Sequence, residues 1–100
     1  MKKFDIEEFQ QFVKERDHWP DNKAEVMLKL VEEVGELANE IRKSNLNGLT
    51  DERYINIKLE LYDCLHYVAQ IANIYDVDLN EAIEMKEKIN KERYKRWRYD

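Results

Sequence analysis

The pattern of apolar and polar positions along the chain predicts four helices and no strands. In four segments the apolar residues recur at the three- and four-residue spacing of an amphipathic helix, and the chain contains only two glycines and one proline. Short connections favour antiparallel neighbours, so we expect an all-α fold, a four-helix antiparallel bundle formed by one domain over residues 1–100. The predicted helices span about residues 5–17, 23–43, 52–75 and 79–96.

Helix-capping residues support these boundaries. Asp5, Asn22 and Asp78 are each followed by a glutamate three residues later, which is typical of a helix N-terminus. Thr50 or Asp51 has the same capping role before the third helix. The turn-forming residues of segment 44–48 predict a loop after the second helix.

The hydrophobic pattern also predicts that the fold is completed by dimerisation. A chain of 100 residues buries only about 60–70% of its unfolded surface, and 39% of these residues are charged, so the core is thin. The helix over 52–75 is nevertheless apolar on most sides in its C-terminal half. Gly35 interrupts the second helix at a cost of about 1 kcal/mol relative to alanine. One explanation of this glycine is the close approach of another helix or a ligand. The other is tight helix packing alone.

Composition and charge exclude several classes of protein. The net charge is −5 and the sequence pI is near 5.1, which makes nucleic acid an unlikely partner. Cys64 is the only cysteine, so we expect no intramolecular disulfide and a reduced, cytoplasmic setting. The N-terminal residues lack the apolar run of a signal peptide. Segment 59–75 is the most apolar stretch, but charged and imidazole side chains interrupt it, so we expect no membrane span.

Two pairs of acids stand at positions where a packing seam is expected to be apolar. Glu33 and Glu36 are three residues apart on the second predicted helix, and Glu60 and Asp63 are three apart on the third. Residues at this spacing share one helical face. If the two helices pack antiparallel, the two pairs converge as four carboxylates, with no obvious Lys or Arg among them.

Three interpretations of these acids follow from their chemistry. The acids are solvated or salt-bridged on the surface, as most helical acids are. Alternatively, they bind a hard cation, since four carboxylates cannot share a site without one and oxygen ligands select Mg²⁺ or Mn²⁺. A di-iron centre is the third interpretation, but it requires Glu-x-x-His motifs, and only Asp63-x-x-His66 comes close to one.

Basic residues form a stripe on the fourth predicted helix. Lys86, Asn90 and Arg93 follow one another at steps of four and three, and together they suit the oxygens of a triphosphate. The alternative is a solvated face in which interspersed glutamates pair with the lysines. Trp19, beside Pro20, either stacks on a nucleotide base or covers the start of the second helix.

These motifs together resemble a known family. Glu32-Glu33-x-x-Glu36, followed about two dozen residues later by Glu60-x-x-Asp63, is similar to the signature of the MazG-like nucleotide pyrophosphohydrolases, which belong to the all-α NTP pyrophosphatase superfamily. The order Lys, Asn, Arg-Tyr between Lys86 and Tyr94 is also similar. The resemblance covers about residues 20–95. One departure is Tyr62, which stands where many members have glycine and leaves the base preference open.

The resemblance implies a function and roles for individual residues. It implies that Glu33, Glu36, Glu60 and Asp63 bind Mg²⁺, and that Glu32 orients or activates water. It also implies that the side chains of the basic stripe approach the phosphates, and that the protein associates with itself as a dimer or tetramer. We therefore expect hydrolysis of (d)NTP to (d)NMP and pyrophosphate. A related dUTPase, dCTPase or phosphoribosyl-ATP pyrophosphatase is the first alternative, and a non-catalytic helical oligomer that binds nucleotide or a protein is the second.

Overall fold

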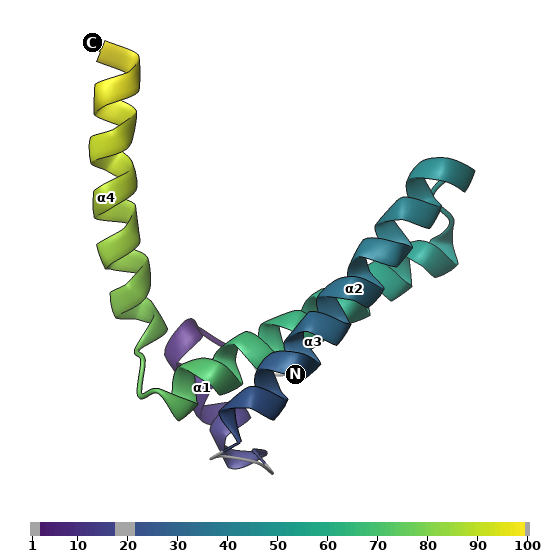
Figure 1. The fold of residues 1–100 in the computed structure, drawn as a ribbon, viewed down its shortest axis with the longest axis horizontal. Coiled ribbons are helices and arrows are strands. Elements are labelled where there is room, and N and C mark those ends of the chain that lie inside the picture. The colour runs from purple at the N-terminus through teal and green to yellow at the C-terminus, as the bar shows by residue number, and fades with distance from the viewer. Residues whose placement is uncertain (1–2, 18–21, 100) are drawn as a thin grey trace.

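The computed structural model of the protein describes residues 3–17 and 22–99, with side chains up to Arg93. Within these residues the chain forms helices and no strands, so the predicted all-α fold with four helices is confirmed. No helix in the described part is both long and apolar enough to cross a membrane. Figure 1 shows the four helices: α1 (Ile6–Glu15), α2 (Lys23–Asn47), α3 (Asp51–Ile74) and α4 (Leu79–Tyr99).

Side-chain caps start the first three helices, as the sequence predicts. Asp5 Oδ1 accepts a hydrogen bond from the Glu8 amide at 2.8 Å, and Glu8 Oε1 accepts one from the Asp5 amide at 3.5 Å, which together make a capping box. Asn22 accepts from the amide of residue 25 at 3.2 Å, and Thr50 accepts from the amide of residue 53 at 3.2 Å. These caps satisfy amides that have no partner within a helix.

The end of α2 differs from the prediction. We predicted that this helix ends near Lys43, but it continues for one more turn to Asn47. Serine and asparagine cost only a few tenths of a kcal/mol more than average residues in a helix, so they do not by themselves end it. Gly48 ends it, with a φ of 91° and an amide that donates to the Ser44 carbonyl at 2.9 Å.

Three helices form the packed part of the chain. The long helices α2 and α3 lie antiparallel to each other, and the short helix α1 packs against α3 near its C-terminal end (Figure 1). The core between α1 and α3 consists of Phe9, Val13 and Ala69, with Phe4 and Phe12 packed against it. This core is small, so each of its residues contributes a large share of the buried apolar surface.

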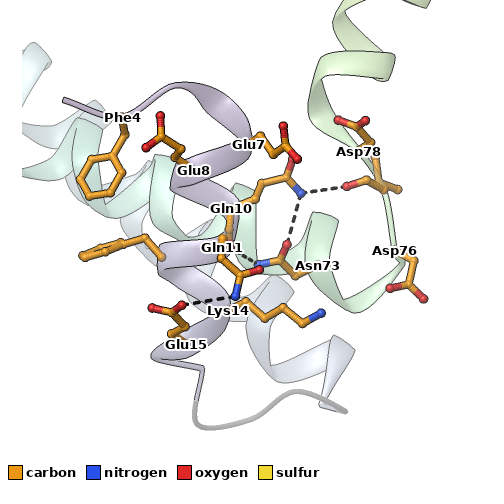
Figure 2. A pocket seen from close by; sticks show the side chains of 12 residues that line it. Phe4, Glu7, Glu8, Gln10, Gln11, Lys14, Glu15, Asn73, Asp76 and Asp78 are labelled. Carbon is orange, nitrogen blue, oxygen red and sulfur yellow. Dashed lines mark hydrogen bonds between the residues drawn. The ribbon is translucent and has the colours of Figure 1, made fainter. Parts of the chain in front are cut away.

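Helix α4 leaves this packed part at an angle. Figure 1 shows α4 diverging from the α2–α3 pair after the short turn that follows α3. Its substantial contact within the chain is with α1. Short connections led us to expect antiparallel neighbours throughout, but within one chain α4 does not lie antiparallel beside α3. The reason is a set of hydrogen bonds between α1 and the α3–α4 turn. Gln10 Nε2 donates to Asn73 Oδ1 at 3.2 Å and to the Val77 carbonyl at 2.8 Å, and Gln10 Oε1 accepts from the Leu79 amide at 2.9 Å (Figure 2).

Many large apolar side chains remain exposed on the surface of the chain. They lie on α2, α3 and α4, and several keep half or more of their surface open to solvent. Large apolar side chains exposed in such number indicate an interface. Examples are Leu28 at 60%, Leu59 at 59%, Leu61 at 53% and Met85 at 60% exposure.

Candidate functional site

Three of the four predicted metal ligands converge between α2 and α3. Glu33 and Glu36 come from one face of α2, and Glu60 comes from the antiparallel α3. One carboxylate oxygen from each of the three lies within 4.8 Å of the others. We call these three residues the carboxylate cluster. The antiparallel pairing of two long helices therefore brings together acids that are about two dozen residues apart in sequence.

Two oxygens of the carboxylate cluster are buried without a hydrogen-bond partner. Glu33 Oε2 and Glu60 Oε2 have almost no solvent contact, and no partner for either is found among the described residues. A buried oxygen of a charged group that lacks a partner costs free energy, commonly a few kcal/mol. Such groups in folded proteins usually have an explanation, such as a bound ion. These two oxygens therefore point to a missing electropositive partner.

The protonation of the cluster reflects the same environment. Burial, a hydrogen bond with Glu60, and the nearby charges of Glu36 and Asp63 raise the pKa of Glu33 to about 7. Burial is also the main cause that raises the pKa of Glu60. Without a cation, the cluster thus relieves its like-charge repulsion by holding a proton up to about pH 7.

The donor set fits a hard divalent cation. Every ligand atom that the cluster offers is a carboxylate oxygen, which is the donor that Mg²⁺ and Mn²⁺ prefer. Two ligands of one Mg²⁺ lie at most about 4.2 Å apart, since each Mg–O distance is about 2.1 Å. The separations within the cluster, up to 4.8 Å, are only slightly larger. Small side-chain rotations therefore bring the three oxygens to bonding distance.

Asp63 and Glu32 stand outside this group of three converging side chains. Asp63 is half-buried one turn after Glu60, and its charge raises the pKa of both Glu33 and Glu60, so it lies close to the cluster. Glu32 is 61% exposed, and its carboxylate pairs with Lys29 Nζ at 3.5 Å. The structure thus leaves Glu32 open to solvent beside the cluster.

The predicted phosphate-binding side chains lie on the diverging helix α4. Lys86 and Arg93 are exposed and Asn90 is half-buried. Within the part of the chain that the structure describes, neither cation forms an ion pair. The chain by itself does not bring these residues to the carboxylate cluster. Trp19 lies outside the described residues.

Two residues that sequence reasoning did not assign to the site lie beside the cluster. Tyr67 is half-buried one turn beyond Asp63, and burial, followed by the charge of Glu33, raises the pKa of its hydroxyl. Lys29 acts on the same hydroxyl in the opposite direction, so its ammonium group lies near Tyr67. The sequence does contain a signal for both residues. Lys29 stands four residues before Glu33 on α2, and Tyr67 stands four residues after Asp63 on α3, so each is a neighbour of an acid on the same helical face.

Comparisons with known proteins found a matching family model and similar crystal structures. A family model described as "MazG nucleotide pyrophosphohydrolase domain" matches residues 21–97. The crystal structure of Ntag-iMazG from Vibrio DAT 722 is 39% identical to this chain, covers 91% of it and 98% of its own chain, and has a TM-score of 0.74. For Ctag-iMazG from the same source, the identity is 39%, the coverage 88% and 99%, and the TM-score 0.73. No curated protein matches.

The matched region contains every part of the candidate site except Trp19. Residues 21–97 include both acid pairs on the α2–α3 pair and the basic stripe on α4. The family model covers well over half of the chain, and the similar crystal structures cover nearly all of it. The chain therefore belongs to the MazG nucleotide pyrophosphohydrolase family.

Proposed function

We propose that the protein is a Mg²⁺-dependent nucleoside triphosphate pyrophosphohydrolase that cleaves (d)NTP to (d)NMP and pyrophosphate, with Mn²⁺ as a substitute ion. The observation that carries this proposal is the carboxylate cluster, in which Glu33 and Glu60 each bury an oxygen without a partner. A divalent cation explains those oxygens, and family membership supports the class of reaction.

The residues of the site have separate roles in this proposal. Glu33, Glu36 and Glu60 hold the cation, and Asp63 completes the set from the next turn of α3. When bound, Mg²⁺ supplies positive charge to the phosphate oxygens of the substrate. Further side chains bind the substrate: Lys86 as a point charge, Arg93 as a planar fork, Asn90 through its amide, and Trp19 as a surface for the base.

The reaction itself transfers the nucleotidyl phosphorus to water. A water oxygen attacks the α-phosphorus in line, and the bond from that phosphorus to the oxygen that bridges the β-phosphorus breaks. Glu32 accepts the proton that the water loses, a role that its exposed position next to Glu33 supports. The products are the monophosphate and pyrophosphate.

The partners of the protein follow from its surface. We propose that the chain works as a homo-oligomer, a dimer or a tetramer, because large apolar side chains on α2, α3 and α4 stay exposed in a single copy. The net charge of −5 opposes binding to nucleic acid, whose affinity depends on neutralising phosphates.

A substrate panel tests the proposal and separates it from its alternatives. The purified protein is incubated with the NTPs, the dNTPs including dUTP, and phosphoribosyl-ATP, each with Mg²⁺, and both pyrophosphate and monophosphate are measured. Glu36→Gln should abolish turnover, whereas Glu25→Gln, an exposed acid two turns before Glu33 on the same helix, should not. Release of inorganic phosphate in place of pyrophosphate, or turnover that persists in EDTA, contradicts the proposal. Binding without turnover would support the non-catalytic alternative.

A further inference from the structure

Lys29 on α2 differs from the other lysines of the chain. Its side chain is half-buried, whereas every other lysine whose side chain the structure describes is exposed. Partial burial removes water from an ammonium group, so such a group needs negative or polar neighbours. The Nζ atom of Lys29 pairs with Glu32 Oε2 at 3.5 Å, but the Glu32 side chain is 61% exposed, and exposed ion pairs stabilise a fold little. The pair with Glu32 alone therefore does not account for the place of Lys29.

Helical geometry puts Lys29 on the face of α2 that carries the carboxylate cluster. Successive residues of an α-helix are rotated by about 100°, so Lys29 lies about 40° from Glu33 around the helix axis and about 6 Å from it along that axis. Glu36 stands about one turn after Glu33, and Lys29 stands about one turn before it. Along α2, the cluster thus has an acid on one side and an ammonium group on the other.

Tyr67 lies opposite Lys29 on α3. Because α2 and α3 run antiparallel, the turn that follows Asp63 on α3 faces the turn that precedes Glu33 on α2 (Figure 1). Burial and the charge of Glu33 raise the pKa of the Tyr67 hydroxyl, whereas Lys29 acts in the opposite direction, so this hydroxyl lies near both side chains. The end of the cluster nearest the N-terminus of α2 therefore offers two hydrogen-bond donors, an ammonium group and a hydroxyl.

A donor pair at this place fits a phosphate group. A phosphate bound beside the cluster has oxygens on several sides, and those turned away from the acids need donors of their own. Lysine binds phosphate as a point charge, and a charge-assisted bond to phosphate is stronger than an exposed ion pair with a glutamate. A substrate phosphate can therefore draw Lys29 away from Glu32.

The position of Glu32 selects the phosphate that lies next to Lys29. In the proposed reaction Glu32 accepts the proton of the attacking water, so this water lies near Glu32. In-line displacement puts the leaving pyrophosphate on the opposite side of the α-phosphorus. Lys29 pairs with Glu32 and is therefore on the side of the water, where the non-bridging oxygens of the α-phosphate are within reach and the leaving group is not.

We propose that Lys29 is a catalytic residue that binds a non-bridging oxygen of the α-phosphate and, by leaving Glu32, frees that carboxylate to accept the proton from water. Lys29 stays protonated and transfers no proton. This inference rests on the proposed function and adds a cation on the same helix as Glu33 and Glu36. It leaves the side chains of α4 for the β- and γ-phosphates.

Binding of the two products tests the contact without turnover. The wild-type protein, Lys29→Gln, Lys29→Arg and Lys43→Gln are titrated calorimetrically in Mn²⁺ with AMP, CMP, GMP and UMP, and separately with pyrophosphate. Lys43 is the matched control, because it is an exposed lysine 14 residues later on the same helix, about 21 Å away.

The expected result is a selective loss of monophosphate binding. Lys29→Gln should weaken the binding of the best-bound monophosphate roughly tenfold to a hundredfold and change pyrophosphate binding less than about twofold. Lys29→Arg should keep most of the monophosphate affinity, and Lys43→Gln should change neither affinity. Equal monophosphate affinity in the wild-type protein and Lys29→Gln, a loss confined to pyrophosphate, or no monophosphate binding by the wild-type protein overturns the inference.

A double-variant cycle tests the release of Glu32. Glu32→Gln removes the carboxylate that competes with the phosphate for Lys29. It should therefore strengthen monophosphate binding when Lys29 is present, and do so less in the Lys29→Gln background. Equal changes in the two backgrounds would overturn the exchange of Lys29 between the two anions.

Turnover separates this inference from the proposed function. Lys29→Gln should lower kcat/KM about tenfold or more, and Lys29→Arg should lower it less. An unchanged kcat/KM in Lys29→Gln overturns the catalytic role of Lys29. A wild-type protein that binds monophosphate through Lys29 but releases no pyrophosphate from any nucleotide would instead refute the proposed function and leave the phosphate contact standing.

Discussion

Binding of a divalent cation to the carboxylate cluster should release a proton at mildly acidic pH. The pKa of Glu33 is raised to about 7 by burial, by its hydrogen bond with Glu60 and by the neighbouring acids, so about nine-tenths of the metal-free protein carries this proton at pH 6 and about one-tenth at pH 8. A ligand carboxylate must be deprotonated, so the cation displaces the proton. From Glu33 alone, the apparent Kd should be about tenfold higher at pH 6 than at pH 8. The raised pKa of Glu60 acts in the same direction.

Calorimetric titration with Mn²⁺ measures this effect directly. At pH 6, the observed enthalpy should depend on the ionisation enthalpy of the buffer with a slope of about one proton per ion, and at pH 8 the slope should fall towards zero. Glu33→Gln should weaken binding and remove most of the proton release at pH 6, whereas Glu25→Gln should change neither. Equal affinity at the two pH values with no proton uptake by the buffer would refute the assignment of the cluster as the metal site.

The same shift in the pKa of Glu33 makes the metal-free protein lose stability as the pH rises. The folded chain holds this proton up to about pH 7, whereas the unfolded chain releases it near the ordinary value of 4.5. The folded state therefore binds more protons between these two values, and the free energy of unfolding falls across that window. Saturating metal adds stability that grows with pH, so the melting temperature should depend on pH much less with Mn²⁺ than in EDTA.

The remaining predictions concern catalysis, the glycine and assembly. Asp63→Asn should lower kcat at least a hundredfold while the circular dichroism spectrum stays helical, because the cation site loses a neighbouring charge. Arg93→Ala and Lys86→Ala should each lower kcat/KM by roughly tenfold to a thousandfold, or about 1.4–4 kcal/mol, with little change in melting temperature. An unchanged kcat/KM in both variants would show that these residues are solvated surface charges, whose ion pairs contribute about 0–1 kcal/mol to the free energy of unfolding. A Cβ added at Gly35 meets nothing within 4 Å in a single copy, so Gly35→Ala should raise the free energy of unfolding by about 1 kcal/mol, and a loss of stability would show that a ligand or second copy fills that space. Sedimentation should show at least a dimer at micromolar concentration, and a folded monomer that retains activity contradicts this.

The parts of the fold that depend on neighbours in sequence were predictable. The caps at Asp5 and Asn22 act on amides three residues away, and the acids of each pair share a face because of helical geometry alone. The convergence of Glu33 and Glu36 with Glu60 required one further step, the antiparallel pairing of two long helices joined by a short loop. That step follows from loop length and from the apolar seam, so the cluster was predictable too.

The direction of α4 was not predictable, because it depends on contacts between distant parts of the sequence. Gln10 and Asn73 are 63 residues apart, and neither belongs to a motif or an apolar seam. The short turn after α3 is compatible with a helix that folds back and with one that leaves at an angle. Hydrogen bonds from two amide side chains favour the second outcome. The hydrophobic periodicity of the sequence does not predict these bonds. The expectation that α4 lies antiparallel beside α3 within one chain was wrong for that reason.

The single chain is incomplete in two ways, and each has its own remedy. Glu33 and Glu60 bury oxygens without partners, which opposes folding unless a cation is bound. The apolar side chains along α2, α3 and α4 remain open to water, which leaves hydrophobic stabilisation unused unless another surface covers them. A bound cation would satisfy those oxygens, and a second copy of the chain would cover that apolar surface. Cation binding and self-association should therefore each raise the melting temperature, because both act on the folded state only.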